Sequence, residues 1–486
     1  MSFIRREIIS GVFWIAVAKY TGLFISLGIT AVLARNITPA AFGTVAVATV
    51  IMTFLDIFTD MGIGPAIIQF KDLTNRQINS LFMVGICLGL FFAIGLFAVA
   101  PFVADFYADP DLRNICKLLS VCMVFNALNV VPNGLMLKAK RFKTVALRTL
   151  FFQVVCGVAA VWGALNGLGI YALIITPILS SIGVFAVNFY NYPQKIILDI
   201  DYSAVKRVWT YSSFQFLFSV TNYFSRNIDK LIIGKYFSMA DLGYYDKSYR
   251  LMQLPLQNIT FVISPVLHPV LSTLQDDKCL LAEKNRSLAV LLSYISFPLG
   301  VLFYFCAGDI VEIVFGPRWE NAVPVFRILS LSLPLQLILS TSGSLFQASG
   351  KTNHMFVCGL INTTVTVVGF IISALCFKTI ESMAWAWDVT LALNFNTTYI
   401  LMNRMTFGCS YFKYLAALMP QVFNALIVFL IAWFVLRFIT VDSLIISLIV
   451  KIAVVVIPTV IIAYMMGQYN VFTIIGRQYR EARDKS

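Results

Sequence analysis

The chain has 486 residues, of which 59% are hydrophobic and only 12% are charged, and its mean hydropathy is +0.84. Soluble domains are about 25% charged and about half apolar, so this composition excludes an ordinary soluble protein. The net charge of +13 does not indicate nucleic-acid binding, because the basic residues gather in short segments beside apolar stretches, where they set membrane orientation. We therefore expect an all-α integral membrane protein that binds no nucleic acid.

Apolar segments long enough to cross a bilayer, about 20 residues each, recur along the whole chain. They predict about 14 transmembrane helices. The expected spans are 10–34, 40–69, 78–104, 112–136, 145–165, 169–190, 209–233, 241–271, 287–306, 322–346, 354–376, 381–402, 412–437 and 443–467. The longest polar connections are expected at 191–208 and 307–322.

The distribution of basic residues predicts the orientation of these spans. Most of the 36 lysines and arginines fall in alternate short connections, and such connections face the cytoplasm. Both termini are therefore expected on the cytoplasmic side. The nine cysteines show no Cys-x-x-Cys spacing, so neither a disulfide framework nor a metal site is predicted.

The chain also repeats itself at an offset of 200 residues. The segment 33–43, LARNITPAAFG, aligns with 233–243, IGKYFSMADLG, which pairs Gly43 with Gly243. Each segment follows the first helix of a six-span unit. Internal repeats of this kind are typical of secondary transporters, whose substrate site lies between the two halves near the middle of the membrane.

The repeat and the spans together predict two pseudo-symmetric six-helix lobes plus two extra helices. The expected parts are an N-lobe at 1–190, a cytoplasmic linker at 191–208, a C-lobe at 209–402, and spans thirteen and fourteen with a basic cytoplasmic tail at 403–486.

The seventh span carries Arg226, Asp229 and Lys230 within five positions. The spacings of three and four residues place the three side chains on roughly one helical face. A charge in hydrocarbon costs roughly 3 kcal/mol even on the mildest scales, so such a group needs a partner or a wet cavity. The cluster is therefore a candidate functional site.

The eighth span carries a second group, Asp246, Lys247 and Arg250. The two groups together hold four bases against two acids, and this excess favours an anionic substrate. We interpret the bases as substrate-binding residues and Asp229 and Asp246 as charge-balancing or ion-coupling residues. The alternative is a network of salt bridges that only holds the two helices together.

Three further charged residues lie in spans of the first lobe. Lys19 either extends to the cytoplasmic surface or joins the substrate cavity as a further binding residue. Asp56 and Asp60 share a face of the second span at a spacing of four. They either balance the bases or bind a coupling ion, Na⁺ or H⁺, and no other cofactor is expected.

Catalytic motifs are scarce. His268 and His354 lack metal-ligand spacing. Asp199 and Asp201 resemble the Asp-x-Asp motif of sugar-nucleotide transferases, but no Rossmann-like domain surrounds them. We therefore predict that the protein is not an enzyme, and a membrane glycan polymerase or ligase is the less favoured interpretation.

Two segments resemble a known family. Residues 33–43 resemble the "LARxLTPxDFG" signature of Wzx-type polysaccharide flippases, in the multidrug/oligosaccharidyl-lipid/polysaccharide exporter superfamily, and residues 227–234, NIDKLIIG, resemble the "xxDxxxIG" segment of their seventh span. Ala41 departs from the signature, where the family usually has an acid. The equivalent position in the second lobe, Asp241, retains the acid.

The resemblance implies two lobes that form a V around a partly cationic cavity and open alternately to each side of a bacterial inner membrane. It implies an undecaprenyl-diphosphate-linked oligosaccharide as the substrate, in the biosynthesis of lipopolysaccharide, capsule or exopolysaccharide. Lys19, Arg226, Lys230, Lys247 and Arg250 would face the diphosphate, which requires positive charge. We expect a monomer that contacts membrane lipids, with a glycan polymerase and a chain-length regulator as further partners. A cation-coupled multidrug exporter that uses Asp56 and Asp60 is the alternative.

Overall fold

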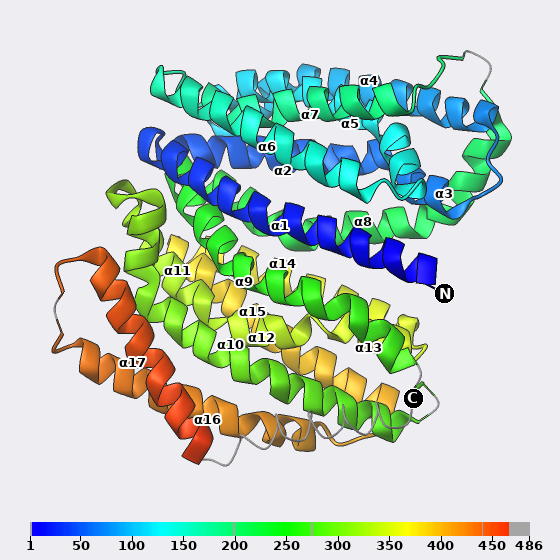
Figure 1. Cartoon of the computed structure of the whole chain (residues 1–486). Coiled ribbons are helices and arrows are strands. Elements are labelled where there is room, and N and C mark those ends of the chain that lie inside the picture. Colours follow the sequence, from blue (N-terminus) through cyan, green and yellow to red (C-terminus); the bar gives the residue numbers. More distant parts are fainter. Residues whose placement is uncertain (1, 198–199, 273, 276, 440, 466–486) are drawn as a thin grey trace. The chain divides into compact units, whose positions relative to one another are not determined.

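The computed structural model describes residues 2–197, 200–272, 274–275, 277–439 and 441–465, and all regular structure in these ranges is helical (Figure 1). The α-helices are α1 Ser2–Asn36, α2 Pro39–Asp60, α3 Ile63–Gln69, α4 Asn75–Tyr107, α5 Asp111–Lys138, α6 Phe142–Leu165, α7 Tyr171–Asn191, α8 Tyr202–Tyr236, α9 Met239–Ser272, α10 Lys278–Phe315, α11 Ala322–Leu331, α12 Leu333–Leu339, α13 Ser342–Ala348, α14 Thr352–Cys376, α15 Ile380–Leu401, α16 Tyr411–Leu436 and α17 Leu444–Met465. A 3-10 turn, Pro317–Trp319, and a π-helical segment, Met402–Phe407, complete the set.

Each predicted span coincides with one or more of these helices. In the described part of the chain, ten helices are long and apolar enough to cross a membrane, and the pair Ala322–Leu331 and Leu333–Ala348, bent by 47°, makes an eleventh candidate. The helices α8, α9 and α15 have 35, 34 and 22 residues but a more polar composition. A multi-pass, all-α membrane protein is thus confirmed, whereas the count of fourteen spans stays a prediction.

The expected span 40–69 coincides with the candidate span Pro39–Gln69. A local break divides it into α2 and α3, because Met61 and Gly62 both adopt left-handed φ angles, of 40° and 76°. One predicted connection differs from the structure. The expected polar connection 307–322 is wrong over most of its length, since α10 continues to Phe315. The helix carries Asp309 because Lys451 of α17 pairs with it, at 2.7 Å between Nζ and Oδ2, and this pair offsets the cost of a charge in an apolar segment.

The chain divides into two compact units. The first contains the residues up to Gly243 together with Val314–Arg318, and the second contains Tyr244–Ile313 and the residues from Trp319 onward. This division follows packing, whereas the lobes predicted from the repeat follow internal similarity. The lobe boundaries therefore stay a prediction.

Helix α8, expected as the first helix of the C-lobe, packs within the first unit against α2. The Ser212 hydroxyl donates a hydrogen bond to the Met61 carbonyl at 2.7 Å, and the Tyr223 hydroxyl donates one to the Val50 carbonyl. The Phe54 ring lies 4.9 Å from the ring of Phe224, measured between centroids. These contacts fix the helix that carries Arg226 to the first unit.

Small residues bring helices of the first unit together. Helices α4, α5 and α7 lie side by side (Figure 1). A Cβ atom added to Gly89 of α4 would lie 2.6 Å from the Cβ of Ala127 on α5, so the close approach requires glycine. Ile67, Leu81 and Phe82 are almost fully buried where α3 meets α4 and α5.

Each glycine of the sequence repeat contacts the chain segment that contains the other glycine. A Cβ on Gly43 would lie 1.8 Å from the Met239 carbonyl oxygen, and a Cβ on Gly243 would lie 2.1 Å from the Pro39 carbonyl oxygen. No residue other than glycine fits at either position without moving the backbone. The equivalence predicted from the sequence therefore corresponds to a reciprocal contact between the starts of α2 and α9.

Capping chemistry explains the acid of the repeated signature. Asp241 and Ser238 form a box at the start of α9: the carboxylate accepts from the Ser238 backbone nitrogen at 3.2 Å, and the Ser238 hydroxyl accepts from the Asp241 nitrogen at 3.1 Å. In α2 the Thr38 hydroxyl accepts from the Ala41 nitrogen at 3.4 Å. Ala41 has no side-chain acceptor to complete the box, and Pro39 provides a preset φ at the first helical position instead.

A core of the second unit lies between α9, α10, α12, α13, α14, α15 and α16. Tyr399 is fully buried, stacks on Tyr414 at 4.5 Å between ring centroids, and donates a hydrogen bond to the Ile338 carbonyl at 2.9 Å. Helix α17 packs beside α16 and is anchored by the pair of Lys451 with Asp309. The two last predicted spans therefore belong to this unit.

Candidate functional site

The group on α8 lies in the first unit and contains one exposed cation. Asp229 is buried, with 1% of its surface exposed, and its Oδ1 accepts a hydrogen bond from the Lys230 backbone nitrogen at 2.8 Å. Lys230 is half-buried, whereas Arg226 is exposed and forms no ion pair with any described carboxylate. The Arg226 guanidinium is thus available to an external anion, while Asp229 faces the protein.

The group on α9 lies in the second unit and shares one acid between two bases. Asp246 is buried, at 1% exposed, and its Oδ2 accepts from the Nε of Arg250 at 2.9 Å and lies 3.8 Å from the Nζ of Lys247. The Arg250 side chain is 60% exposed. Since one carboxylate serves two cations, the group keeps one net positive charge, and the Arg250 terminal nitrogens retain donors.

Lys19 lies on α1 in the first unit and is half-buried. One turn further along α1, the Gly22 carbonyl accepts a hydrogen bond from Gln153 of α6 at 2.6 Å. The predicted bases thus form one group on α8 and a second group on α9, and Lys19 lies on a third helix, α1. Their roles in substrate binding stay a prediction.

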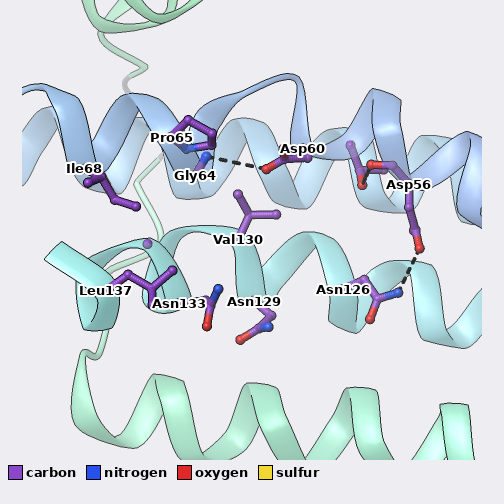
Figure 2. Close-up of a pocket in the computed structure, with 12 residues that line it drawn as sticks. Asp56, Asp60, Gly64, Pro65, Ile68, Asn126, Asn129, Val130, Asn133 and Leu137 are labelled. Atoms are coloured by element: carbon purple, nitrogen blue, oxygen red, sulfur yellow. Dashed lines mark hydrogen bonds between the residues drawn. The ribbon is translucent and has the colours of Figure 1, made fainter. Parts of the chain in front are cut away.

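The acidic pair on α2 lines a cavity of about 430 Å³ within the first unit (Figure 2). Asn126 of α5 donates a hydrogen bond to the Oδ2 of Asp56 at 3.0 Å, and the Gly64 backbone nitrogen donates to the Oδ1 of Asp60 at 3.5 Å. The Oδ1 of Asp56 is enclosed and has no hydrogen-bond partner among the described residues. The two carboxylates thus accept from neutral donors.

The wall facing the acids consists of asparagines that were not predicted from the sequence. Asn126, Asn129 and Asn133 project from α5 toward α2 or α7 (Figure 2). Asn188 of α7 donates to the Oδ1 of Asn129 at 2.7 Å and to that of Asn133 at 3.4 Å. Their spacing of three and then four residues on an apolar helix is the signal that would have identified this face.

A buried acid of the second unit was also not predicted. Both carboxylate oxygens of Asp388, on α15, are enclosed and accept no hydrogen bond from a described residue. The neighbouring Ser332, between α11 and α12, donates its hydroxyl hydrogen to the Leu329 carbonyl instead, at 2.5 Å. Asp388 has no second acid three or four positions away, so the sequence contained no pattern that would have identified it.

Two acids outside the spans have structural roles. Asp201 caps α8 and accepts from the Ser203 hydroxyl and nitrogen, at 2.6 and 2.9 Å, and these bonds lower the pKa of Asp201. The Asp-x-Asp pattern thus contains a helix cap, and Asp199 lies outside the described residues. Arg207 binds both oxygens of Asp72, at 2.7 and 3.0 Å, and this contact lowers the pKa of the Asp72 carboxyl.

Solved structures define the class of fold. A structure of "Lipid II flippase MurJ, inward closed conformation" matches with a TM-score of 0.77 at 14% identity, over 95% of this chain and 100% of that one. An inward-facing multidrug resistance MATE family transporter of the MOP superfamily matches with a TM-score of 0.58 at 12% identity, over 77% of this chain and 93% of that one. The chain is thus a multi-pass membrane protein with the fold that MurJ and MATE transporters share.

Residues 32–324 match the model of a family described as polysaccharide biosynthesis protein. The chain belongs to this family, which confirms the resemblance drawn from residues 33–43 and 227–234. Relatives include the lipopolysaccharide biosynthesis protein WzxC of Escherichia coli (strain K12), 26% identical over 85% of both chains. The teichuronic acid biosynthesis protein TuaB of Bacillus subtilis (strain 168) is 24% identical over 81% of this chain and 82% of its own. The succinoglycan biosynthesis transport protein ExoT of Rhizobium meliloti (strain 1021) is 24% identical over 78% of this chain and 77% of its own.

Proposed function

We propose that this protein is a flippase that moves an undecaprenyl-diphosphate-linked oligosaccharide from the cytoplasmic to the periplasmic leaflet of a bacterial inner membrane. The product would serve surface polysaccharide synthesis. The names of the relatives support a role in polysaccharide biosynthesis, and the structural likeness to the lipid II flippase MurJ supports transport of a lipid-linked molecule. On this proposal the protein is a transporter and not an enzyme.

The observation that carries the proposal is the excess of positive charge on α8 and α9. Arg226 is exposed without a described carboxylate partner, and Arg250 is 60% exposed although it binds Asp246. A diphosphate is an anion that arginine recognises through paired, charge-assisted hydrogen bonds. A cationic drug would favour the opposite excess of charge. We therefore propose Lys19, Arg226, Lys230, Lys247 and Arg250 as diphosphate contacts.

The proposed mechanism is alternating access between two six-helix lobes that form a V, with fourteen spans and both termini in the cytoplasm. The repeat and the reciprocal contact of its glycines support an origin from two equivalent halves. Asp229 and Asp246 balance the bases or couple transport to a gradient of Na⁺ or H⁺, and supply of the substrate alone is the alternative source of energy. The protein acts as a monomer beside a glycan polymerase and a chain-length regulator.

A deletion strain tests the proposal. Complementation with the Arg226→Ala or Lys230→Ala variant is expected to leave the surface glycan absent and the lipid-linked oligosaccharide accumulated, at unchanged protein abundance. Arg113→Ala, which changes an exposed base of α5 in the same unit, should complement fully. Full complementation by both α8 variants would contradict the proposal.

A further inference from the structure

The cavity of the first unit has the size of a small-ligand site. Its volume is about 430 Å³, and pockets for small ligands range from about 300 to 1,000 Å³. Asp56 and Asp60 of α2 lie on one side and the asparagines of α5 on the other (Figure 2). Ile68 and Val130 add apolar surface. The lining therefore combines opposed polar walls with apolar contact area.

Arg148 fixes the direction of the hydrogen bonds behind the asparagine wall. An arginine side chain only donates hydrogen bonds, and the Arg148 guanidinium of α6 donates to the Oδ1 of Asn188. The other end of the Asn188 amide must therefore donate. It does so to the Oδ1 atoms of Asn129 and Asn133, at 2.7 and 3.4 Å. One cation thus sets the orientation of three amides.

This orientation decides which atoms remain for a ligand. The oxygens of Asn129 and Asn133 are engaged by Asn188, so their Nδ2 groups are the donors left, and no described residue accepts from them. On the facing wall the carboxylates of Asp56 and Asp60 line the cavity, and an ionised carboxylate only accepts hydrogen bonds. The cavity therefore presents donors on α5 and acceptors on α2.

A neutral sugar matches this arrangement. Each hydroxyl both donates and accepts, so a ring with several hydroxyls can accept from the asparagines and donate to the aspartates. Its C–H surface can contact Ile68 and Val130. A sodium ion would instead require a shell of oxygen ligands, whereas the α5 wall presents amide N–H donors, and its amide oxygens already accept hydrogen bonds from Asn188. The acids disfavour an anionic sugar.

We propose that this cavity is a subsite for a neutral sugar residue, with Asp56, Asn129 and Asn133 as its contacts and Arg148 as the residue that positions them. The assignment of that sugar to the lipid-linked glycan rests on the proposed function. The subsite itself rests on the contacts within the first unit.

The test uses the full chain in lipid nanodiscs and free sugars. Isothermal calorimetry would measure binding of the methyl glycosides of glucose, galactose, mannose and N-acetylglucosamine, and of NaCl in a separate titration. At least one glycoside is expected to bind. Asp56→Asn and Asn129→Leu should each weaken it at least tenfold, whereas the exposed controls Asp111→Asn and Asn166→Ala should not.

The positioning role of Arg148 has its own matched pair. Lysine also only donates, so Arg148→Lys should retain sugar binding. Glutamine can donate or accept hydrogen bonds, so Arg148→Gln should no longer fix the orientation of the Asn188 amide. Its affinity for the sugar should fall at least tenfold. The melting temperature of each variant in nanodiscs is measured alongside. A merely structural role would lower binding only in proportion to lost folded protein, and equal behaviour of the two variants would overturn the role.

The outcomes separate this subsite from the proposed function. Absence of binding by all four glycosides, or binding of Na⁺ that Asp56→Asn abolishes, would overturn the sugar subsite. A strain that exports glycan normally with the Asn129→Leu variant would overturn its place in the substrate path while the proposed function stands. Sugar binding in a protein that does not support export would support the subsite and contradict the function.

Discussion

Replacing Arg226 by alanine removes an exposed guanidinium from α8 without breaking an ion pair of the described residues. If this group binds the diphosphate, the variant loses hydrogen bonds to a charged group, worth about 1.5 to 3 kcal/mol. Such a loss corresponds to a roughly 10- to 150-fold weaker affinity. Because the guanidinium has no hydrogen bond or ion pair with a described residue to lose, the melting temperature should stay unchanged.

Binding of undecaprenyl diphosphate to the protein in nanodiscs measures this effect. Arg226→Lys keeps the charge but loses the planar pair of donors, so its affinity should lie between those of the wild type and the alanine variant. The difference should shrink as salt is raised, because an exposed charge is screened. An alanine variant that binds as tightly as the wild type at low salt would refute the assignment of Arg226.

Three further predictions concern the fold. Gly43→Ala should lower the free energy of unfolding by about 1 to 3 kcal/mol or more, because the added methyl group overlaps the Met239 carbonyl. Gly28 has open space around it, so Gly28→Ala should not lower the melting temperature. Equal effects of the two substitutions would contradict the close contact at Gly43. Lys451→Met leaves Asp309 without its cation and should lower the melting temperature, and adding Asp309→Leu should restore most of it; no gain from the double variant would count against the pair. Arg207 lowers the pKa of Asp72. The salt bridge between the two side chains is therefore fully formed above about pH 3.9 and is lost only as the pH falls through the lowered pKa of Asp72. Accelerated hydrogen exchange at the start of α8 already at pH 6 would contradict this prediction.

Much of the fold was predictable because it depends on local patterns. Apolar runs located the helices, and the offset between Gly43 and Gly243 located a contact that the structure contains. The extension of α10 was not predictable, since Asp309 is neutralised by Lys451, which lies 142 positions away in the chain. A hydropathy average over neighbouring residues includes the charge of Asp309 but not that of its distant partner, Lys451.

The candidate site was predictable only where charges are neighbours in sequence. The pair of Asp246 with Arg250 follows from a spacing of four residues and is present. The cavity network joins Arg148, Asn188 and Asn129 from three helices. The spacing of the asparagines on α5 marks their shared face, but their links to Asn188 and Arg148 join helices that are distant in the sequence, so the network itself became visible only after folding.

Transport in reconstituted vesicles tests the central claim most directly. Lipid-linked oligosaccharide extracted from a producing strain would be placed in proteoliposomes, and its exposure to an impermeant glycan-modifying reagent would be followed in time. With the wild-type protein, glycan from the inner leaflet should become accessible, while Arg226→Ala vesicles should stay at the protein-free level. Wild-type vesicles that expose glycan no faster than protein-free vesicles, with or without a Na⁺ or H⁺ gradient, would contradict the proposed flippase.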